Sequence, residues 1–318
     1  MKAQYKNVTV LAPARLHMGF IDLSRALGRD FGSIGIGLKE INTQVSISQA
    51  EILQVSGPVA ERAKQLTQQL CQVMQVSDNL RIELISAIPE HVGLGSGTQM
   101  CLAIGMGLSE FYGLGLTARD VARLTERGAR SGIGIAVFEK GGLVVDGGRG
   151  PTTQTPPLLA HLPVPADWRF ILVFDQRGQG LHGQQEINAF KQLPAFSRSD
   201  AEKLSYLLLM QALPAVAEND LTSFGAVISA LQAAVGEHFA AVQGGIFTSP
   251  EVAAAMQMLE QLGAVAIGQT SWGPTGFCAV KAVAAQAMLQ QAEQAFAGTH
   301  LVFMLVTASN QGAEITHS

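Results

Sequence analysis

The residues best suited to bind an anion lie between Ile88 and Gly105. This stretch reads Ile-Pro-Glu-His-Val-Gly-Leu-Gly-Ser-Gly-Thr-Gln-Met-Cys-Leu-Ala-Ile-Gly. Glycine permits positive φ and lets the backbone approach a ligand closely. A strand-like run precedes the turn and a helix-like run follows it, so the N–H groups of a helix N-terminus would face the ligand. The pattern predicts a phosphate-binding turn, with an ordinary tight turn as the alternative; its candidate residues are Gly93, Leu94, Gly95, Ser96, Gly97 and Thr98.

Charged and titratable residues near the N-terminus could act on such an anion. Residues 12–23 contain Arg15, His17 and Asp22, and Arg25, Arg29 and Asp30 follow at once. A glycine-alternating run, residues 31–38, comes next and indicates a strand whose backbone approaches something closely. Together with the arginines it suggests a phosphorylated ligand. Taken alone, Arg15 could be a surface charge, His17 a core histidine, and the Arg25–Asp30 segment a solvated loop.

A second cationic segment spans residues 127–142. It contains Arg127, Arg130 and Ser131. Two cations beside a phosphate loop suit a ligand that carries more phosphate or carboxylate than a neutral sugar does.

Two glycine-rich loops in the second half of the chain add weaker candidates. Residues 175–183 are dense in glycine and charge and include Arg177 and His182, which we expect to face a cleft. Residues 269–280 include Ser271, Trp272 and Thr275. The Trp272 ring could stack on a planar ligand, although a core tryptophan would explain it equally well.

Composition narrows the class of protein. Hydrophobic residues make up 47% of the 318 residues and charged residues 14%, which fits a compact protein with a large core. The net charge of -4 gives no electrostatic reason to expect nucleic-acid or membrane-surface binding. The 3 cysteines lack metal-ligand spacing and read as buried thiols. The polar start, residues 1–6, has no apolar signal core, so we expect a cytoplasmic protein.

The elements that would position these residues follow from periodicity and turn signals. Strands are predicted at residues 7–11, 44–55, 80–85, 143–146, 168–174, 264–268 and 301–307, and helices at 59–74, 117–128, 186–190, 200–219, 220–239, 251–262 and 283–297. Thr117 and Asp120 have the spacing of a helix capping box. The Pro- and Thr-rich residues 151–165 read as a connection, which divides the chain into domains of residues 1–165 and 166–318.

Three blocks resemble those of the galactokinase, homoserine kinase, mevalonate kinase and phosphomevalonate kinase (GHMP) superfamily. The central block is Pro89-x3-Gly93-Leu94-Gly95-Ser96, and residues 12–23 and 269–280 resemble the first and third blocks. The resemblance implies an α+β, two-domain fold, with a ribosomal-S5-like N-terminal domain and a ferredoxin-like C-terminal domain. Many of these kinases have Ser-Gly-x-Asp, whose Asp takes the proton of the attacking hydroxyl. Here Ser131-Gly132-Ile133 is followed by Gly134, so that base is absent.

The departures from the kinase pattern, taken together, resemble the β-ribofuranosylaminobenzene 5′-phosphate synthase family. That resemblance implies an enzyme of tetrahydromethanopterin biosynthesis that joins 5-phosphoribosyl-1-diphosphate to 4-aminobenzoate or 4-hydroxybenzoate. Carbon dioxide and diphosphate leave, and Mg²⁺ accompanies the diphosphate. The family also makes a homodimer an expectation.

The same resemblance implies roles for the candidate residues. The glycine loop would bind diphosphate, and Arg15, Arg127 and Arg130 would neutralise phosphate or carboxylate. His17 and Asp22 would orient groups, transfer protons or assist Mg²⁺, while Ser131 would contact substrate. Ser271, Trp272 and Thr275 would close over the ring or the ribose phosphate, and Arg177 and His182 are further candidates for substrate binding.

Two other classes of function stay open at this point. One is an ATP-dependent kinase of a small hydroxy compound, and the other is a non-catalytic ligand-binding protein that has kept the fold. Turnover with ATP would identify the first, and binding of phosphoribosyl diphosphate without turnover would identify the second.

Overall fold

The first half of the chain is built on a twisted sheet. The computed structural model describes residues 4–177, 193–270 and 273–318. In this part a seven-stranded sheet has the order β11-β1-β2-β4-β3, and β5 and β6 continue it beside β2. The strands are β1 (Asn7–Asp22), β2 (Phe31–Gln49), β3 (Gln54–Ser56), β4 (Leu80–Ser86), β5 (Leu143–Asp146), β6 (Leu158–Leu162) and β11 (Glu314–His317).

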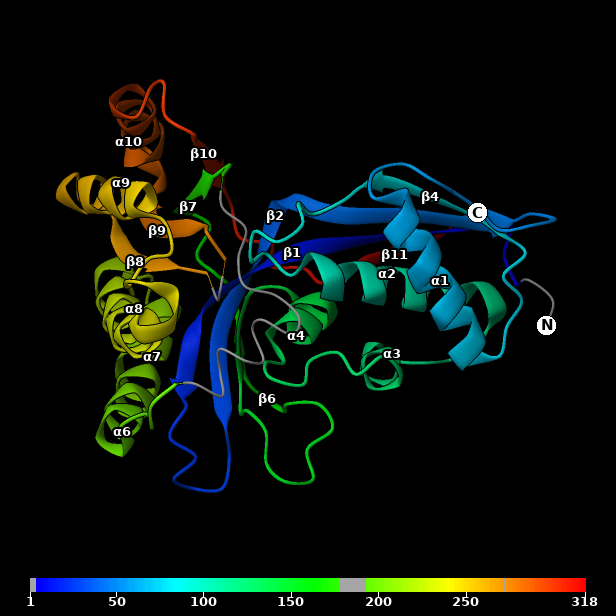
Figure 1. The fold of residues 1–318 in the computed structure, drawn as a ribbon, viewed down its shortest axis with the longest axis horizontal. Coiled ribbons are helices and arrows are strands. Elements are labelled where there is room, and N and C mark those ends of the chain that lie inside the picture. Colours follow the sequence, from blue (N-terminus) through cyan, green and yellow to red (C-terminus); the bar gives the residue numbers. More distant parts are fainter. Residues whose placement is uncertain (1–3, 178–192, 271–272) are drawn as a thin grey trace.

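Strands β1 and β2 form a long antiparallel hairpin that reaches from the first sheet to the second half of the molecule (Figure 1). Their register shifts between Pro13 and Ala14 and again between His17 and Gly19. Such bulges bend a strand and re-aim its side chains. The second shift therefore lies beside His17, within residues 12–23, where the sequence predicts catalytic residues.

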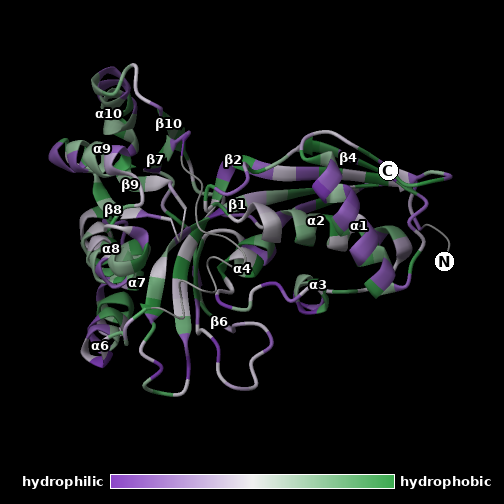
Figure 2. Cartoon of the chain, in the orientation of Figure 1, coloured by the Kyte–Doolittle hydropathy of each residue, from purple (hydrophilic) through white to green (hydrophobic). Residues whose placement is uncertain are grey.

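Four helices cover one face of this sheet, and the second of them supports the glycine loop. They are α1 (Ala60–Met74), α2 (Ser96–Tyr112), α3 (Ala118–Leu124) and α4 (Ile133–Lys140). Nearly all of α2 beyond its first turn is buried, whereas α1 has polar residues on its outer side (Figure 2). Because α2 packs on β1 and β2 and is flanked by the other three helices, its N-terminus is held in a fixed position.

The second half of the chain forms a four-stranded antiparallel sheet with the order β10-β7-β9-β8. Successive residues of β7 face opposite layers: Phe170 and Leu172 belong to the core shared with the first sheet, while Ile171 and Val173 pack with the outer helices. This alternation has the period of a strand covered on both faces. The elements are β7 (Trp168–Asp175), β8 (Val265–Gln269), β9 (Gly276–Lys281), β10 (Leu301–Val306), α6 (Arg198–Leu207), η1 (Leu208–Ala212), α7 (Leu213–Ala217), α8 (Leu221–Gln243), α9 (Pro250–Gln261) and α10 (Ala282–Ala295).

Most predicted elements are confirmed within one to three residues, but some predictions are wrong. The predicted strand 7–11 is only the start of β1, and the predicted strand 44–55 is divided between β2 and β3. Residues 151–165 are not only a connection, because β6 lies within them and pairs with β5. The predicted helix 117–128 ends at Leu124, although its capping box at Thr117 and Asp120 is present. Helix α4 was not predicted, and the predicted helix 200–219 is interrupted by the π-helical turn η1. The predicted helix 186–190 lies outside the described residues.

The two domains predicted on either side of residue 165 share a sheet and a hydrophobic core. Strand β11 lies near residue 318 but pairs with β1, and Leu38 forms a bridge with Ala308. The largest core also joins both halves, since β1 and β2 residues pack with α8. The division at residue 165 therefore stays a prediction, and the chain crosses it more than once.

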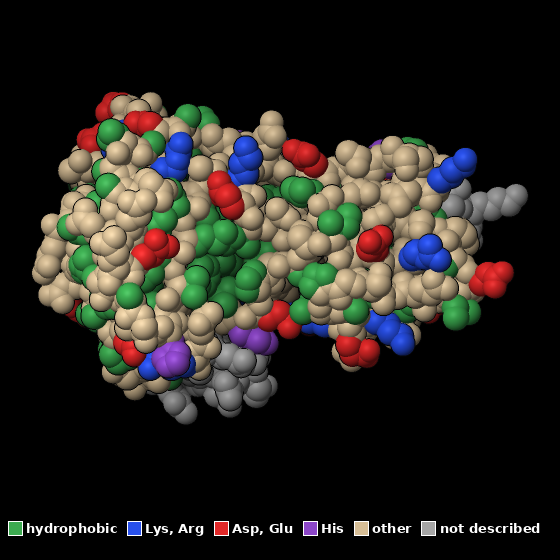
Figure 3. Space-filling view, turned by 90° about the horizontal axis from the view of Figure 1, so that it is seen from above, with side chains coloured by type: hydrophobic (Ala, Val, Ile, Leu, Met, Phe, Trp, Pro, Cys, Tyr) green, Lys and Arg blue, Asp and Glu red, His purple; other side chains and the backbone are tan. Residues whose placement is uncertain are grey.

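The distribution of surface charge agrees with the small net charge of the sequence. Figure 3 shows acidic and basic side chains scattered over one face, without a large field of a single sign. In the described part of the chain, α8 alone is long and apolar enough to pass a test for a membrane-crossing helix. It packs on β8, and a core helix passes the same test.

Candidate functional site

A cavity of about 250 Å³ collects predicted site residues from three separate segments. Strand β1 supplies Arg15 and His17, the first turn of α2 supplies Thr98, and the segment between α3 and α4 supplies the rest. The cavity is thus lined mainly by cations and polar groups close to the glycine loop. Its lining residues are Arg15, His17, Phe20, Thr98, Glu126, Arg127, Gly128, Ala129, Arg130 and Ser131.

The glycine loop has the backbone that the sequence pattern demands. Gly93 and Gly95 have φ values of 79° and 83°, in the left-handed region that favours glycine. Gly95 is the N-cap of α2, and no side chain in the described part of the chain caps it. The first turn of α2 also carries no acidic residue. Its N–H groups and partial positive charge are therefore available to an anion.

Arg15 holds this loop in place as well as lining the cavity. The Arg15 guanidinium donates a hydrogen bond to the Gly93 carbonyl, and the backbone N–H of Arg15 donates to the Leu94 carbonyl at 3.1 Å. A Cβ built on Gly95 would lie 2.9 Å from Arg15 Cγ. Gly95 is thus required both by its φ value and by the close approach of this side chain.

Two further arginines lie beside the start of α2. A Cβ built on Gly97 would lie 2.8 Å from Arg62 Nη2 and 3.6 Å from Arg127 Nη1. Arg127 was a predicted site residue, but Arg62 was not. It comes from α1 and forms an ion pair with Glu90, which follows the proline of the central motif. Only the packing of α1 on α2 reveals Arg62, because its sequence neighbours resemble an ordinary surface helix.

His17 is fully enclosed, with 1% of its surface exposed. Neither ring nitrogen has a hydrogen-bond partner on another residue in the described part of the chain. Burial, reinforced by the positive charge of Arg15, holds the pKa of His17 well below its usual range. The imidazole is therefore neutral at pH 7 and can orient a group, but it cannot offer a positive charge there.

Gly134 lies where many GHMP kinases have an aspartate, and the structure leaves little room for one. A Cβ built on Gly134 would lie 3.1 Å from Thr98 Cγ2. The Gly134 carbonyl accepts a hydrogen bond of 2.8 Å from the Gln99 side chain. Helices α4 and α2 therefore pack closely at this point, and a side chain at residue 134 would require Thr98 to give way by a few tenths of an ångström.

Ser131 is fixed by a buried network rather than by the cavity alone. The Asp146 carboxylate accepts hydrogen bonds from Ser33 Oγ at 2.6 Å and from the Gly132 N–H at 2.9 Å, and Ser131 Oγ lies 3.3 Å away. Burial raises the pKa of Asp146, while these hydrogen bonds oppose the rise. The network sets the start of α4 and hence the position of Ser131 on the cavity wall.

The third sequence block packs against the glycine loop. Thr270 Oγ1 donates to the Gly93 carbonyl and Thr275 Oγ1 to the Val92 carbonyl, both at 2.7 Å. A Cβ built on Gly273 would lie 2.8 Å from Gly93 Cα. Thr275 thus holds the loop from behind instead of lining the cavity. Ser271 and Trp272, predicted to close over the ligand, lie outside the described residues.

Asp22 is not brought to this cavity. Its carboxylate accepts hydrogen bonds from the Ser24 N–H at 2.7 Å and from Ser24 Oγ at 2.6 Å, which fixes the turn after β1. It lines a separate and mainly apolar cavity of about 660 Å³. The predicted catalytic role of Asp22 therefore has no support from its contacts.

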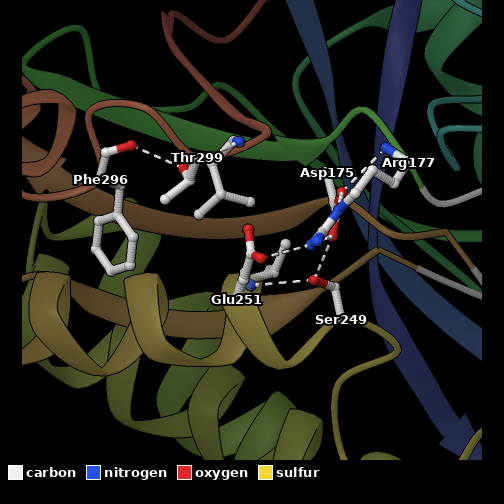
Figure 4. A network of polar contacts seen from close by, with 8 residues as sticks. Asp175, Arg177, Ser249, Glu251, Phe296 and Thr299 are labelled. Carbon is white, nitrogen blue, oxygen red and sulfur yellow. Dashed lines mark hydrogen bonds and ion pairs between the residues drawn. The ribbon is translucent and has the colours of Figure 1, made fainter.

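Arg177 belongs to a network at the end of β7, shown in Figure 4. It forms ion pairs with Asp175 at 2.9 Å and with Glu251 at 2.8 Å, and Ser249 Oγ donates to Asp175 at 2.6 Å. These contacts join β7 to the start of α9. Arg177 lines none of the cavities described here, so it is placed as a structural residue. His182 lies outside the described residues.

Asp175→Asn is expected to lower the free energy of unfolding by about 2 kcal/mol at pH 7, because a buried carboxylate loses its charge-assisted partners. Arg177 holds the pKa of Asp175 far below its usual range. Since the folded pKa is the lower one, this stabilisation is complete above about pH 4 and is lost as the pH falls towards the folded pKa. Urea unfolding at pH 7 and pH 3 should show the difference from wild type shrinking at the lower pH. Asp167→Asn, an exposed partner of Lys281, is the control; an equal deficit for Asp175→Asn at both pH values would contradict the assignment.

The acidic groups near the cavity bear on metal binding. No group of three His, Cys, Asp or Glu side chains suited to a metal occurs among the described residues. Glu126, which sequence reasoning missed, places one carboxylate on the cavity wall. Mg²⁺ commonly binds through one or two carboxylates plus substrate phosphates and water. The Glu126 carboxylate fits a metal that arrives with a phosphorylated substrate.

Comparison with known proteins gives consistent matches. The model of the GHMP kinases N terminal domain matches residues 59–142, and that of the GHMP kinases C terminal domain matches residues 212–298. A beta-ribofuranosylphenol 5'-phosphate synthase of Archaeoglobus fulgidus is 36% identical over 232 residues, covering 69% of this chain and 74% of that protein. The synthase of the same name from Methanothermobacter thermautotrophicus is 29% identical over 290 residues, covering 84% and 87%.

Solved structures show the same fold at low identity. The L. major mevalonate kinase in complex with R-mevalonate has a TM-score of 0.71 at 15% identity, with 98% of this chain and 99% of that chain covered. At this identity the likeness shows the fold alone. The predicted two-domain α+β fold of the GHMP kinases is therefore confirmed.

Proposed function

Since the chain belongs to the beta-ribofuranosylphenol 5'-phosphate synthase family, it is an enzyme with the GHMP kinase fold. We propose that it joins 5-phosphoribosyl-1-diphosphate to 4-hydroxybenzoate or 4-aminobenzoate, with release of carbon dioxide and diphosphate. The names of the relatives, which specify a phenol product, favour 4-hydroxybenzoate. The reaction would serve tetrahydromethanopterin biosynthesis.

One observation supports this proposal above all. The cavity contains several arginines but lacks the aspartate that serves as the base in many GHMP kinases. Arg15, Arg127 and Arg130 line the cavity beside the uncapped start of α2. Gly134, packed against Thr98, offers no carboxylate at the position from which many GHMP kinases deprotonate the alcohol. A site of this kind suits a substrate with a large anionic leaving group, and it suits poorly a kinase that relies on that aspartate.

The reaction itself needs no strong base. The bond between the anomeric carbon and diphosphate breaks, and the ring carbon that carries the carboxylate supplies the electron pair for the new carbon–carbon bond. The bond to the carboxylate then breaks, its electron pair restores the aromatic ring, and carbon dioxide leaves. The protein must neutralise the leaving diphosphate, orient the ring and exclude water, which are electrostatic and positional tasks.

The residues divide these tasks according to their positions. The N–H groups at the start of α2, with Arg62 and Arg127 beside them, would bind diphosphate. Arg15 would keep the glycine loop in shape, and neutral His17 would orient the ribose. Glu126 would hold Mg²⁺, which would add positive charge to the diphosphate when bound.

A carbon dioxide release assay tests the proposal. Purified protein would be given carboxyl-labelled 4-hydroxybenzoate or 4-aminobenzoate, Mg²⁺, and either phosphoribosyl diphosphate or ATP. We expect labelled CO₂ only with phosphoribosyl diphosphate, in amounts equal to the diphosphate formed, and none after chelation of the metal. No release from either acid, or phosphorylation of a hydroxy compound by ATP, would overturn the proposed function.

A further inference from the structure

A second cavity shares Arg130 with the first one. Its volume is about 610 Å³. This volume lies in the range of small-molecule sites. It has ring and aliphatic walls as well as charged groups. The lining residues used in the argument are Arg25, Asp30, Phe31, Arg130, Phe196 and His238.

A chain of touching rings connects the two cavities. His17 contacts Phe20 with ring centroids 4.6 Å apart, and Phe20 lies 5.7 Å from Phe31. On the other side, His238 contacts Phe196 edge-on at 5.0 Å. Ring pairs at such distances favour a further planar ring among them. The second cavity therefore offers ring contacts to an aromatic ligand.

His238 is the polar group at the ring-lined part of this cavity. It comes from α8 and is half-buried. Burial lowers the pKa of His238, so the imidazole is neutral at pH 7. A neutral imidazole has one nitrogen that accepts a hydrogen bond, and it can accept from a phenol or an aniline.

The chemistry of the proposed reaction fixes how the acid must lie. The carbon that bears the carboxylate attacks the anomeric carbon, so the carboxylate end must point to the diphosphate cavity. The substituent at position 4 then points the opposite way. As the ring attacks, positive charge develops on that substituent, and a hydrogen-bond acceptor there stabilises the transition state more than the bound substrate.

We propose that the second cavity holds the aromatic acid, with its carboxylate at Arg130 and its 4-substituent hydrogen-bonded to His238. Phe31 and Phe196 pack against the ring. His238 is thereby the residue that selects a 4-hydroxy or 4-amino acid over benzoate and that assists the ring attack. This assignment of the acid rests on the proposed function.

Binding measurements test the assignment without requiring turnover. Calorimetric titrations with 4-hydroxybenzoate and with benzoate, in the presence of Mg²⁺ and diphosphate, would compare wild type with His238→Phe, which keeps the ring. We expect wild type to prefer 4-hydroxybenzoate by about 10-fold, as for one hydrogen bond, and His238→Phe to lose that preference while still binding benzoate. His238→Gln, which can accept a hydrogen bond, should restore part of the preference.

Controls separate the possible outcomes. His300→Phe, on an exposed loop before β10, should behave as wild type, and the melting temperature would confirm that each variant is folded. A folded His238→Phe that keeps the full preference, or wild type that binds neither acid, would overturn the assignment. If wild type releases no CO₂ yet shows the His238-dependent preference, the proposed function fails and the binding site stands.

Discussion

Replacing Arg130 by Ala is expected to lower kcat/KM by about 30- to 1000-fold, which corresponds to about 2–4 kcal/mol of transition-state stabilisation. Arg130 lines both the cavity proposed for diphosphate and the second cavity, so under the proposed function its guanidinium would lie where the two substrates meet. Charge develops at that junction when diphosphate leaves and the ring attacks. Initial rates of CO₂ release at varied concentrations of both substrates would measure the loss.

The matched control for this prediction is Arg123→Ala. Arg123 lies on α3, is exposed, and pairs with Asp120 one helical turn away. Surface pairs of this kind contribute little, so both rate and melting temperature should stay close to wild type. Arg130→Lys should recover only part of the activity, because lysine keeps the charge but not the paired N–H donors. A kcat/KM for Arg130→Ala within about twofold of wild type would remove Arg130 from the site.

Gly95→Ala is expected to reduce activity by about 100-fold or more while leaving the protein folded. The φ value of 83° costs an L-residue about 1–2 kcal/mol, and the new methyl group would approach Arg15 Cγ within 2.9 Å. Arg15 and the first turn of α2 would have to separate, and misplaced groups of this kind cost catalysis heavily. Steady-state kinetics and thermal unfolding of the same preparation would separate the two effects.

Gly115→Ala provides the comparison, because Gly115 has a φ value of 67° but open space around its Cα. It should lose a similar amount of stability through backbone strain and retain full activity. If the two variants lose activity equally, the loss at Gly95 comes from general destabilisation, and the contact with Arg15 has no special role.

Features that depend on residues close together in the sequence could be predicted from it. The glycine loop, the helix after it and the capping box at Thr117 each depend on neighbours within a few residues. The cluster of Arg15, Arg127 and Arg130 was also predicted, because each lies in or next to a block that resembles the GHMP pattern. Composition and periodicity likewise gave most helix and strand positions.

Features that depend on long-range packing could not be predicted. Arg62 lies in an ordinary amphipathic helix and His238 in a mainly apolar one, and only the folded chain places them beside the start of α2 and the second cavity. Asp22 and Arg177 were predicted as site residues because they lie in polar loops. In the structure Asp22 fixes a turn and Arg177 fixes the end of a strand. The absence of a base at residue 134 was visible in the sequence, but the close contact of Gly134 with Thr98 was not.

The pairing of β11 with β1 has a consequence for folding during synthesis. One edge of β1 meets β2 soon after both are made, but its other edge has no partner until residues 314–317 leave the ribosome. An unpaired edge is a site for wrong pairing with other chains. The nascent chain is therefore exposed to aggregation for almost the whole of its translation, and slow elongation or truncation before β11 should increase its dependence on chaperones.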